Sequence, residues 1–212
     1  MIHNIASLSS NWPQQSTPSI VSIGNFDGMH LGHQKLMNYC RKLKQQTTYS
    51  IIVITFNPSP RIFFKQQKPF EKISNNQEKW NLLTSYGCEQ LFNLHFNEEF
   101  QHCTASHFIE SILLNQCHCK HLVVGKNWSF GHQRQGNPDW IKKQHYPLTV
   151  HTLDLAATIQ GDILSSSALR TQLQLGNLES YSRMTGRPLK QSIEINKPEP
   201  QIPLPNFPPI LQ

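Results

Sequence analysis

The sequence predicts an α/β fold built on a doubly wound parallel sheet. Apolar, β-branched runs alternate along the chain with segments whose apolar residues recur at helical spacing. The first such run ends in a glycine-containing turn that leads straight into a helical segment, and a later run, HLVVG, also ends in glycine. Strands that alternate with helices in this way favour parallel pairing, with helices on both faces of the sheet.

The first third of the chain has the pattern of a strand, a helix and a second strand. Residues 20–24 form a β-branched run, apolar residues then recur at helical spacing between 31 and 46, and the run YSIIVITF covers 49–56. We expect a right-handed crossover to join the two strands in parallel.

The rest of the chain continues this alternation. Gly87 is a typical helix stop, and Phe108, Ile109, Ile112 and Leu113 fall on one stripe of a helix. The predicted elements are a helix over 77–87, a strand over 91–96, a helix over 105–117, a strand over 121–125, and helices over 165–176 and 178–184.

The chain is predicted to form one domain over residues 1–186, followed by a tail over 187–212. A length of 212 residues is enough for one well-buried core. The stretch KPEPQIPLPNFPPILQ holds six prolines and has neither a helical nor a strand period. We therefore expect the tail to be extended, partly polyproline-like or disordered.

Composition narrows the classes of partner. The net charge of +6 suits a polyanion, but no basic cluster is longer than Arg41, Lys42 and Lys44, so nucleic acid is not expected. No apolar run approaches the length of a membrane span, and the first residues lack a secretory leader. The five cysteines are an odd number, and the run CHCKH (117–121) lacks C-x-x-C spacing, so reduced structural thiols in a cytoplasmic protein are expected rather than zinc ligands.

The turn GNFDGMHLGH is the first candidate site. A strand that ends in such a turn before a helix brings free backbone N–H groups and the positive end of the helix dipole together, which suits a phosphate. His30 and His33 are three residues apart, so they share one side of the first helical turn, where imidazolium groups could donate to phosphate oxygens. Gly32 would let a ligand approach the backbone. The simpler interpretation is an Asp27-Gly28 turn with both histidines in solvent.

A carboxylate at this turn needs its own explanation, because it would repel phosphates. We expect Asp27 either to shape the loop or to reach a water molecule of a Mg²⁺ ion that phosphate oxygens mainly hold.

The stretch SSSALR is the second candidate site. Ser165, Ser166 and Ser167 stand at a predicted helix N-terminus, and Arg170 follows one turn later with a guanidinium suited to phosphate. The simpler interpretation is a serine N-cap with Arg170 in solvent. Together with the histidine turn, a phosphate site is the better interpretation.

The stretch NPSP (57–60) is the third candidate site. Its prolines stiffen the backbone and leave an apolar edge bordered by Phe56, Phe63 and Phe64. A flat aromatic ring system could stack there. A surface turn beside ordinary core phenylalanines would give the same pattern.

Four stretches in order resemble the motifs of one family. GNFDGMHLGH resembles the signature of the prokaryotic FAD synthetases, the bifunctional riboflavin kinase/FMN adenylyltransferases, whose N-terminal module belongs to the H-x-G-H nucleotidyltransferases. TFNPSPRIFF (55–64), VGKNWSFG (124–131) and LSSSALR (164–170) resemble that family's Phe-x-Pro-x-Pro, Val-Gly-x-x-Phe-x-Phe-Gly and Ile-Ser-Ser-Thr-x-x-Arg segments. Together they span about residues 20–185, which makes a chance match improbable.

The resemblance implies a Rossmann-like fold and an FMN adenylyltransferase, which transfers AMP from ATP to FMN and gives FAD and pyrophosphate. It also implies Mg²⁺ bound mainly through the ATP phosphates. The implied catalytic residues are His30, His33, Asn25 and Asp27; the implied ATP-binding residues are Gly24, Phe26, Gly32, Ser165, Ser166, Ser167 and Arg170; and the implied FMN-binding residues are Pro58, Pro60, Phe64, Asn127 and Phe130.

Four positions depart from the family pattern. Trp128 stands for a phenylalanine and Ser167 for a threonine, and both keep the relevant chemistry. Ser59 stands where histidine is common and Asn137 where aspartate is common, and these changes bear on flavin fit and loop geometry.

The resemblance does not extend into a kinase module. After MTGRP (184–188), which resembles the start of that module, the family continues into a β-barrel that this sequence does not show. The expectation is adenylyltransferase chemistry without riboflavin kinase chemistry, with FMN supplied by a separate riboflavin kinase.

Two other functions remain open at this point. One is another H-x-G-H nucleotidyltransferase with a different phosphorylated acceptor, although the prolines and aromatics of 55–64 suit a tricyclic ring better than a flexible arm. The other is a non-catalytic protein that binds a nucleotide or flavin.

Overall fold

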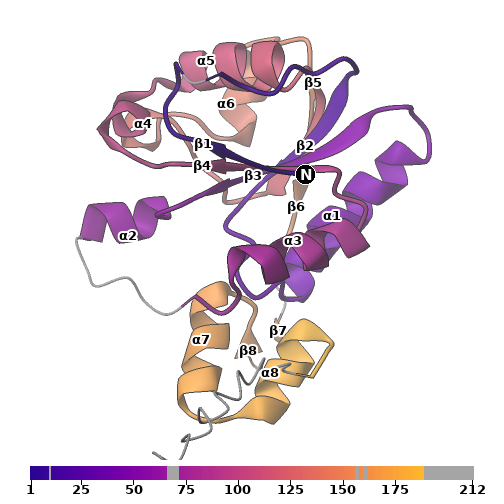
Figure 1. The fold of residues 1–212 in the computed structure, drawn as a ribbon, viewed down its shortest axis with the longest axis vertical. Coiled ribbons are helices and arrows are strands. Elements are labelled where there is room, and N and C mark those ends of the chain that lie inside the picture. Colours follow the sequence, from indigo (N-terminus) through magenta and orange to yellow (C-terminus); the bar gives the residue numbers. More distant parts are fainter. Residues whose placement is uncertain (10, 66–71, 156–157, 160–161, 189–212) are drawn as a thin grey trace, which may run out of the picture.

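The computed structural model describes residues 1–9, 11–65, 72–155, 158–159 and 162–188 (Figure 1). In this part of the chain the main sheet has six strands in the order β1-β4-β3-β2-β5-β6. They are β1 (Ile2–Ile5), β2 (Ser19–Ile23), β3 (Ser50–Phe56), β4 (Gln90–Leu94), β5 (Cys119–Gly125) and β6 (Thr149–Leu153).

Every neighbouring pair of strands in this sheet is parallel, and β2 lies between β3 and β5. From β2 the chain adds β3 and β4 on one side of β2, and it then adds β5 and β6 on the other side of β2. This reversal confirms the doubly wound parallel fold. It also places the crevice that such folds use for ligands between the carboxyl ends of β2 and β5.

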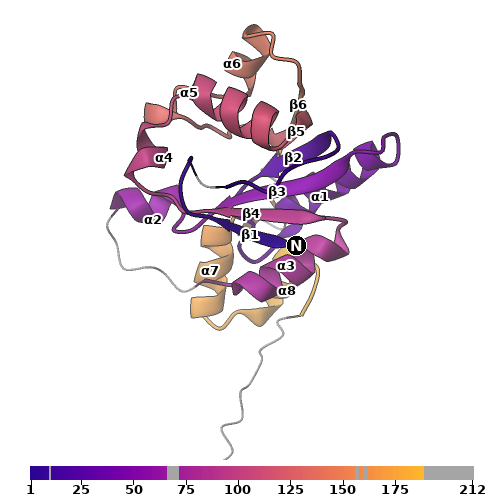
Figure 2. The ribbon, with the colours of Figure 1, turned by 45° about the horizontal axis from the view of Figure 1, so that its top comes forward.

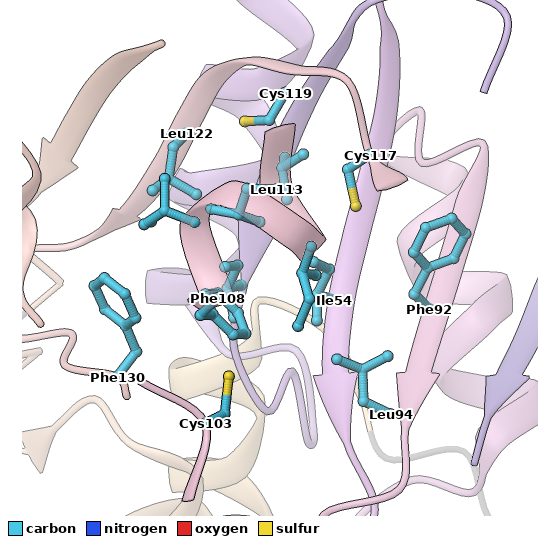
Figure 3. Close-up of a cluster of buried hydrophobic side chains, with 14 of the residues drawn as sticks. Ile54, Phe92, Leu94, Cys103, Phe108, Leu113, Cys117, Cys119, Leu122 and Phe130 are labelled. Atoms are coloured by element: carbon cyan, nitrogen blue, oxygen red, sulfur yellow. The ribbon is translucent and has the colours of Figure 1, made fainter. Parts of the chain in front are cut away.

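Helices cover both faces of the sheet (Figure 2). On one face, α1 (Leu31–Lys44) and α3 (Asn76–Ser85) pack on a buried cluster that includes Ile51, Val53 and Val123. The opposite face carries α5 (Ala105–His107) and the π-helix η1 (Phe108–Gln116), where Phe108 and Leu113 pack against Ile54 and Leu122 (Figure 3). Because side chains alternate along a strand, each strand supplies both clusters.

Two further helices lie beside the carboxyl edge of the sheet. They are α7 (Ser166–Gln174) and α8 (Leu178–Thr185), whose Leu169, Tyr181 and Met184 form a small core of their own. Leu31 and Ile73 pack against that core, which fixes the pair beside the turn that follows β2.

Short elements complete the described chain. They are α2 (Pro60–Lys65), α4 (Glu98–His102), α6 (Pro138–Lys143), the 3₁₀ turn η2 (His132–Arg134), and the antiparallel pair β7 (Thr158–Ile159) and β8 (Asp162–Ile163).

The four predicted strands and the five predicted helices are confirmed, with one difference in geometry. The predicted helix over 105–117 is mostly π-helical, and the amide of Cys117 donates to the carbonyl of Ile112, five residues earlier, at 2.9 Å.

The predicted tail begins too early. Arg187, which was expected to belong to it, donates from Nη2 to the carbonyl of Gly28 at 2.6 Å and from Nη1 to the carbonyl of Met29 at 3.0 Å. The remaining tail residues, 189–212, lie outside the described part of the chain.

The five cysteines are free thiols and all are buried. Burial raises the pKa of Cys40, Cys88 and Cys119 to about 12 and that of Cys103 to about 11. These are the structural thiols expected from the sequence. Among the described residues, no helix is both long enough and apolar enough to span a membrane.

Candidate active site

The turn between β2 and α1 brings the two histidines of the H-x-G-H motif into contact. Their rings stack with centroids 3.8 Å apart. The His33 ring also packs against the Phe26 ring, with centroids 5.0 Å apart. His30 is the N-cap residue of α1, but its side chain makes no capping hydrogen bond. A Cβ at Gly32 would come within 3.0 Å of the His30 ring, so glycine is needed for the ring to fold over the backbone here.

The histidines differ from the sequence-based picture in charge and exposure. His30 and His33 are 4% and 8% exposed, so neither faces solvent. Burial lowers the pKa of His30 to about 4, and burial and the nearby charges of His30 and Lys79 lower the pKa of His33 well below its usual value. At neutral pH the rings are therefore neutral, and the expected imidazolium pair is wrong for this state of the protein.

The neutral rings still have hydrogen-bonding capacity. Nδ1 of His30 and Nδ1 of His33 are buried and make no hydrogen bond within the described residues. A neutral imidazole donates through one nitrogen and accepts through the other. The pair can thus offer N–H groups to phosphate oxygens without carrying a charge.

The lowered pKa of His30 predicts a loss of stability in acid. The unfolded chain takes up a proton near pH 6.5 and the folded chain only near pH 4, so the unfolding free energy is fully present above pH 6.5 and falls as the pH drops through this window. The loss from this group is on the order of 3 kcal/mol by pH 4.

Urea unfolding of the wild type and of His30→Ser at pH 7 and pH 4.5 checks this prediction. The variant should gain stability relative to the wild type at the lower pH. An equal loss in both proteins would contradict a shifted His30. The exposed His145 provides a control, and His145→Asn should follow the wild type.

Asp27 connects the turn to two other parts of the chain. Its Oδ1 accepts hydrogen bonds from the backbone N–H of Ile73 at 3.1 Å and of Ser74 at 3.2 Å, and from the Ser74 hydroxyl at 3.3 Å. Its Oδ2 forms an ion pair with Nη2 of Arg170 at 2.9 Å, and both side chains are largely buried. Of the two expected roles for Asp27, the geometry supports the one in which it shapes the loop.

The serine segment converges on the same turn. The Ser166 hydroxyl donates to the Asp27 carbonyl at 2.8 Å, which confirms that the two sequence-distant motifs meet. Ser165 is the N-cap of α7 and accepts from the backbone N–H of Ala168, while Ser167 accepts from Nη1 of Arg61 at 2.6 Å. The simpler interpretation placed Arg170 in solvent, whereas its side chain is largely buried. The same interpretation expected a serine N-cap, and Ser165 is that cap.

A cavity of about 250 Å³ lies between the carboxyl ends of β2 and β5. It is lined by Gly24 and His33 from one strand end and by Lys126, Asn127 and Trp128 from the other. This is the crevice expected from the strand order, and Asn127, one of the expected flavin-binding residues, lines it together with His33.

A second cavity, of about 290 Å³, is walled by aromatic rings. Of the expected flavin-binding residues, Pro60, Phe64 and Phe130 line it. Trp128 stacks on Phe130 with centroids 4.4 Å apart and lines both cavities, so the two are neighbours. Phe64 is 59% exposed, which leaves one wall open to solvent.

The side chains of two residues expected to bind the substrates do not line the cavity expected for them. The Phe26 side chain is fully buried beneath His33, so only its backbone can reach a ligand. Pro58 follows a cis peptide bond and does not line the aromatic cavity.

Asn137, one of the departures from the family pattern, caps α6 by accepting from the backbone N–H of Trp140 at 2.8 Å. Aspartate would cap in the same way. Ser59, the other departure, is at the start of α2, where its carbonyl accepts from Ile62 and Phe63.

Several site residues were missed by sequence reasoning. Phe96, Phe100 and Phe108 line the aromatic cavity, and Lys79 lies close enough to His33 to lower its pKa. The phenylalanines come from three separate segments and fit ordinary core patterns, so no local signal marks them. The sequence marks Lys79 only by its place four residues before Leu83 in the helical segment 77–87.

Asp27 is the residue of the turn that was considered for contact with a Mg²⁺ ion. No group of three or more His, Cys, Asp or Glu side chains in the described residues could hold a metal ion. Both carboxylate oxygens of Asp27 already accept hydrogen bonds, so this residue fits a metal ion poorly unless Arg170 moves away.

Known proteins resemble this chain over most of its length. The FAD synthetase family model matches residues 12–168. A bifunctional riboflavin kinase/FMN adenylyltransferase from Buchnera aphidicola subsp. Acyrthosiphon pisum (strain APS) is 35% identical over 187 residues, which cover 88% of this chain and 58% of that protein. An FAD synthetase from Listeria monocytogenes serovar 1/2a is 28% identical, with coverage of 82% and 71%.

One solved structure supports the fold. A crystal structure described as a macrolide-efflux protein from Streptococcus pneumoniae superimposes with a TM-score of 0.80 at 27% identity, over 89% of this chain and 60% of that chain. The chain thus spans less than two thirds of the length of the Buchnera protein and of the Streptococcus structure.

Proposed function

Because the chain belongs to the FAD synthetase family, we propose that it transfers AMP from ATP to FMN and releases FAD and pyrophosphate. One observation carries the proposal. A cavity beside the H-x-G-H turn and a cavity walled by aromatic rings meet at Trp128, at the carboxyl edge of the sheet. The first suits a nucleotide and the second a flat ring system, and neighbouring sites are what a transfer between two bound molecules requires.

ATP occupies the cavity between β2 and β5 in this proposal. Gly24 and Asn127 line the space for the nucleoside, Gly32 lets the His30 ring lie over the backbone, and His30 and His33 donate N–H groups to the phosphates. Ser166, Ser167 and Arg170 lie on the other side of the turn, at the N-terminus of α7, where the helix dipole favours the anionic end of the triphosphate.

FMN occupies the aromatic cavity with its ring system between Phe64 and Phe130. One oxygen of its phosphate attacks the α-phosphorus of ATP while the bond to the departing pyrophosphate breaks. Such a reaction needs in-line placement and charge neutralisation rather than a covalent intermediate on the protein. Asn25 and Asp27 act by fixing the turn, since Asp27 is bound to Ser74 and Arg170.

Magnesium completes the proposal. We expect Mg²⁺ to bind mainly through oxygens of the ATP phosphates, as is common for this ion, and to neutralise their charge. Asp27 keeps its role in the loop. The buried thiols fit a reducing cytoplasm, and FMN would come from a separate riboflavin kinase activity.

The purified chain, incubated with FMN and Mg-ATP, tests the proposal. FAD and pyrophosphate should appear in equal amounts by chromatography and a coupled pyrophosphate assay, and EDTA should stop the reaction. Riboflavin with ATP should give no FMN. Binding of FMN and ATP without any FAD would leave the chain a binding protein and refute the proposed catalysis.

A further inference from the structure

Lys79 on α3 is a largely buried lysine that lines a pocket. The residue is 6% exposed, and its Nζ forms no hydrogen bond or ion pair within the part of the chain that the structure describes. By contrast, Lys72, Lys44 and Lys126 each reach an oxygen acceptor. An ammonium group that has lost most of its hydration is costly, so its presence calls for an explanation other than packing.

The surroundings of Lys79 favour an anion. It lines a small pocket together with Asn25, Asp27, Asn57 and Lys72. The Asp27 carboxylate is already paired with Arg170, so the two lysines leave an excess of positive charge in the pocket. Burial, together with Lys72, lowers the pKa of Lys79 to about 8 despite the opposing effect of Asp27, so the side chain is mostly protonated at neutral pH.

The pocket adjoins the aromatic cavity and the turn that carries the histidines. Phe56 lines both this pocket and the aromatic cavity, so the two are neighbours. Asn25 and Asp27 belong to the turn that carries the histidines, and the charge of Lys79 acts on His33. A group bound at Lys79 is therefore close to the phosphates of the bound nucleotide.

We propose that Lys79 binds the phosphate of the acceptor, a flavin phosphomonoester, and so both selects the phosphorylated flavin and holds the attacking oxygen. This inference rests on the proposed function. The ammonium is a compact charge suited to a phosphate dianion. It reduces the repulsion between the acceptor phosphate and the triphosphate before the new P–O bond forms and pyrophosphate leaves. It neither gains nor loses a proton in the reaction.

The test compares FMN with riboflavin, which has the same rings and lacks the phosphate. Flavin fluorescence quenching gives the affinity of the full chain for each. The variant Lys79→Met keeps the length of the side chain and removes its charge. It should bind FMN about tenfold to a hundredfold more weakly, as expected for a lost hydrogen bond to a charged group, and bind riboflavin within twofold of the wild type. Lys79→Arg should recover part of the FMN affinity.

A matched control and a stability measurement separate this role from a structural one. Lys120→Met removes an exposed lysine near the amino end of β5 and should change neither affinity. Lys79→Met should melt at or above the wild-type temperature, because an apolar group replaces a buried charge.

The results that would overturn the role of Lys79 differ from those that would overturn the proposed function. Unchanged FMN affinity in Lys79→Met overturns the inference alone, while the wild type continues to make FAD. Equal weakening of FMN and riboflavin with a lower melting temperature assigns Lys79 to the fold and also overturns it. A wild-type chain that binds no flavin and makes no FAD overturns the proposed function together with this inference.

Discussion

Replacing His30 with serine is expected to lower kcat by about a hundredfold to a thousandfold and to leave the fold intact. His30 is buried in the H-x-G-H turn with an unpartnered Nδ1, and in the proposed reaction it donates to the phosphates as charge develops on them. Loss of one such donor costs about 3–4 kcal/mol of transition-state stabilisation. Serine cannot reach as far as the imidazole.

The fold should survive this change because of the position of His30 in α1. It occupies the N-cap with extended backbone (φ −63°, ψ 166°) and makes no capping hydrogen bond, whereas serine is a favoured N-cap residue. Steady-state kinetics with FMN and Mg-ATP, together with circular dichroism melting, check both parts. A kcat within threefold of the wild type in a folded variant would remove His30 from the catalytic machinery. His145→Asn is again the control.

Replacing Asp27 with alanine is expected to lower the unfolding free energy by about 3–5 kcal/mol, the usual cost of removing one partner of a buried ion pair. Asp27 accepts from two backbone N–H groups and one hydroxyl, and it faces the guanidinium of Arg170 at 2.9 Å. Alanine removes all of these acceptors at once and takes away the carboxylate that balances the Arg170 charge. Urea denaturation measures the loss.

A double-mutant cycle assigns that loss to the pair. Arg170→Met alone should also destabilise the chain, and the double variant should lose less than the sum of the two single losses. The exposed pair of Asp139 and Lys142, 3.6 Å apart, is the matched control, and Asp139→Ala should cost at most about 0.5 kcal/mol. Strict additivity in the Asp27 and Arg170 cycle would show that the two residues do not act together.

The strands in the middle of the sheet were predictable because both of their faces are buried. β2 is buried along its whole length, and such strands appear in the sequence as continuous apolar runs. β1 and β6 were missed because they are edge strands with half-exposed polar residues, and the sequences IHNI and TVHTL do not form such a run. The helices α2, α4 and α6 have only five or six residues, too few to show a period.

The site was predictable where the chemistry lies within one short stretch. His30, Gly32 and His33 are neighbours in sequence, and their grouping followed from helix geometry alone. Their charge did not follow, because the pKa of an imidazole depends on burial by distant segments. The pairing of Asp27 with Arg170 and the burial of Lys79 arise from the packing of α7 and α3 against the turn, which no local pattern encodes.

The central claim is that one flavin dinucleotide spans two adjoining cavities at the carboxyl edge of the sheet. A crystal structure of the chain with FAD bound tests it most directly. We predict that the flavin rings lie in the aromatic cavity between Phe64 and Phe130, that the adenosine lies between the ends of β2 and β5, and that the pyrophosphate bridge crosses the turn at His30 and His33. The flavin or the adenosine bound instead in the groove lined by Asn81, Leu82 and Tyr181, between α3 and α8, would contradict the claim.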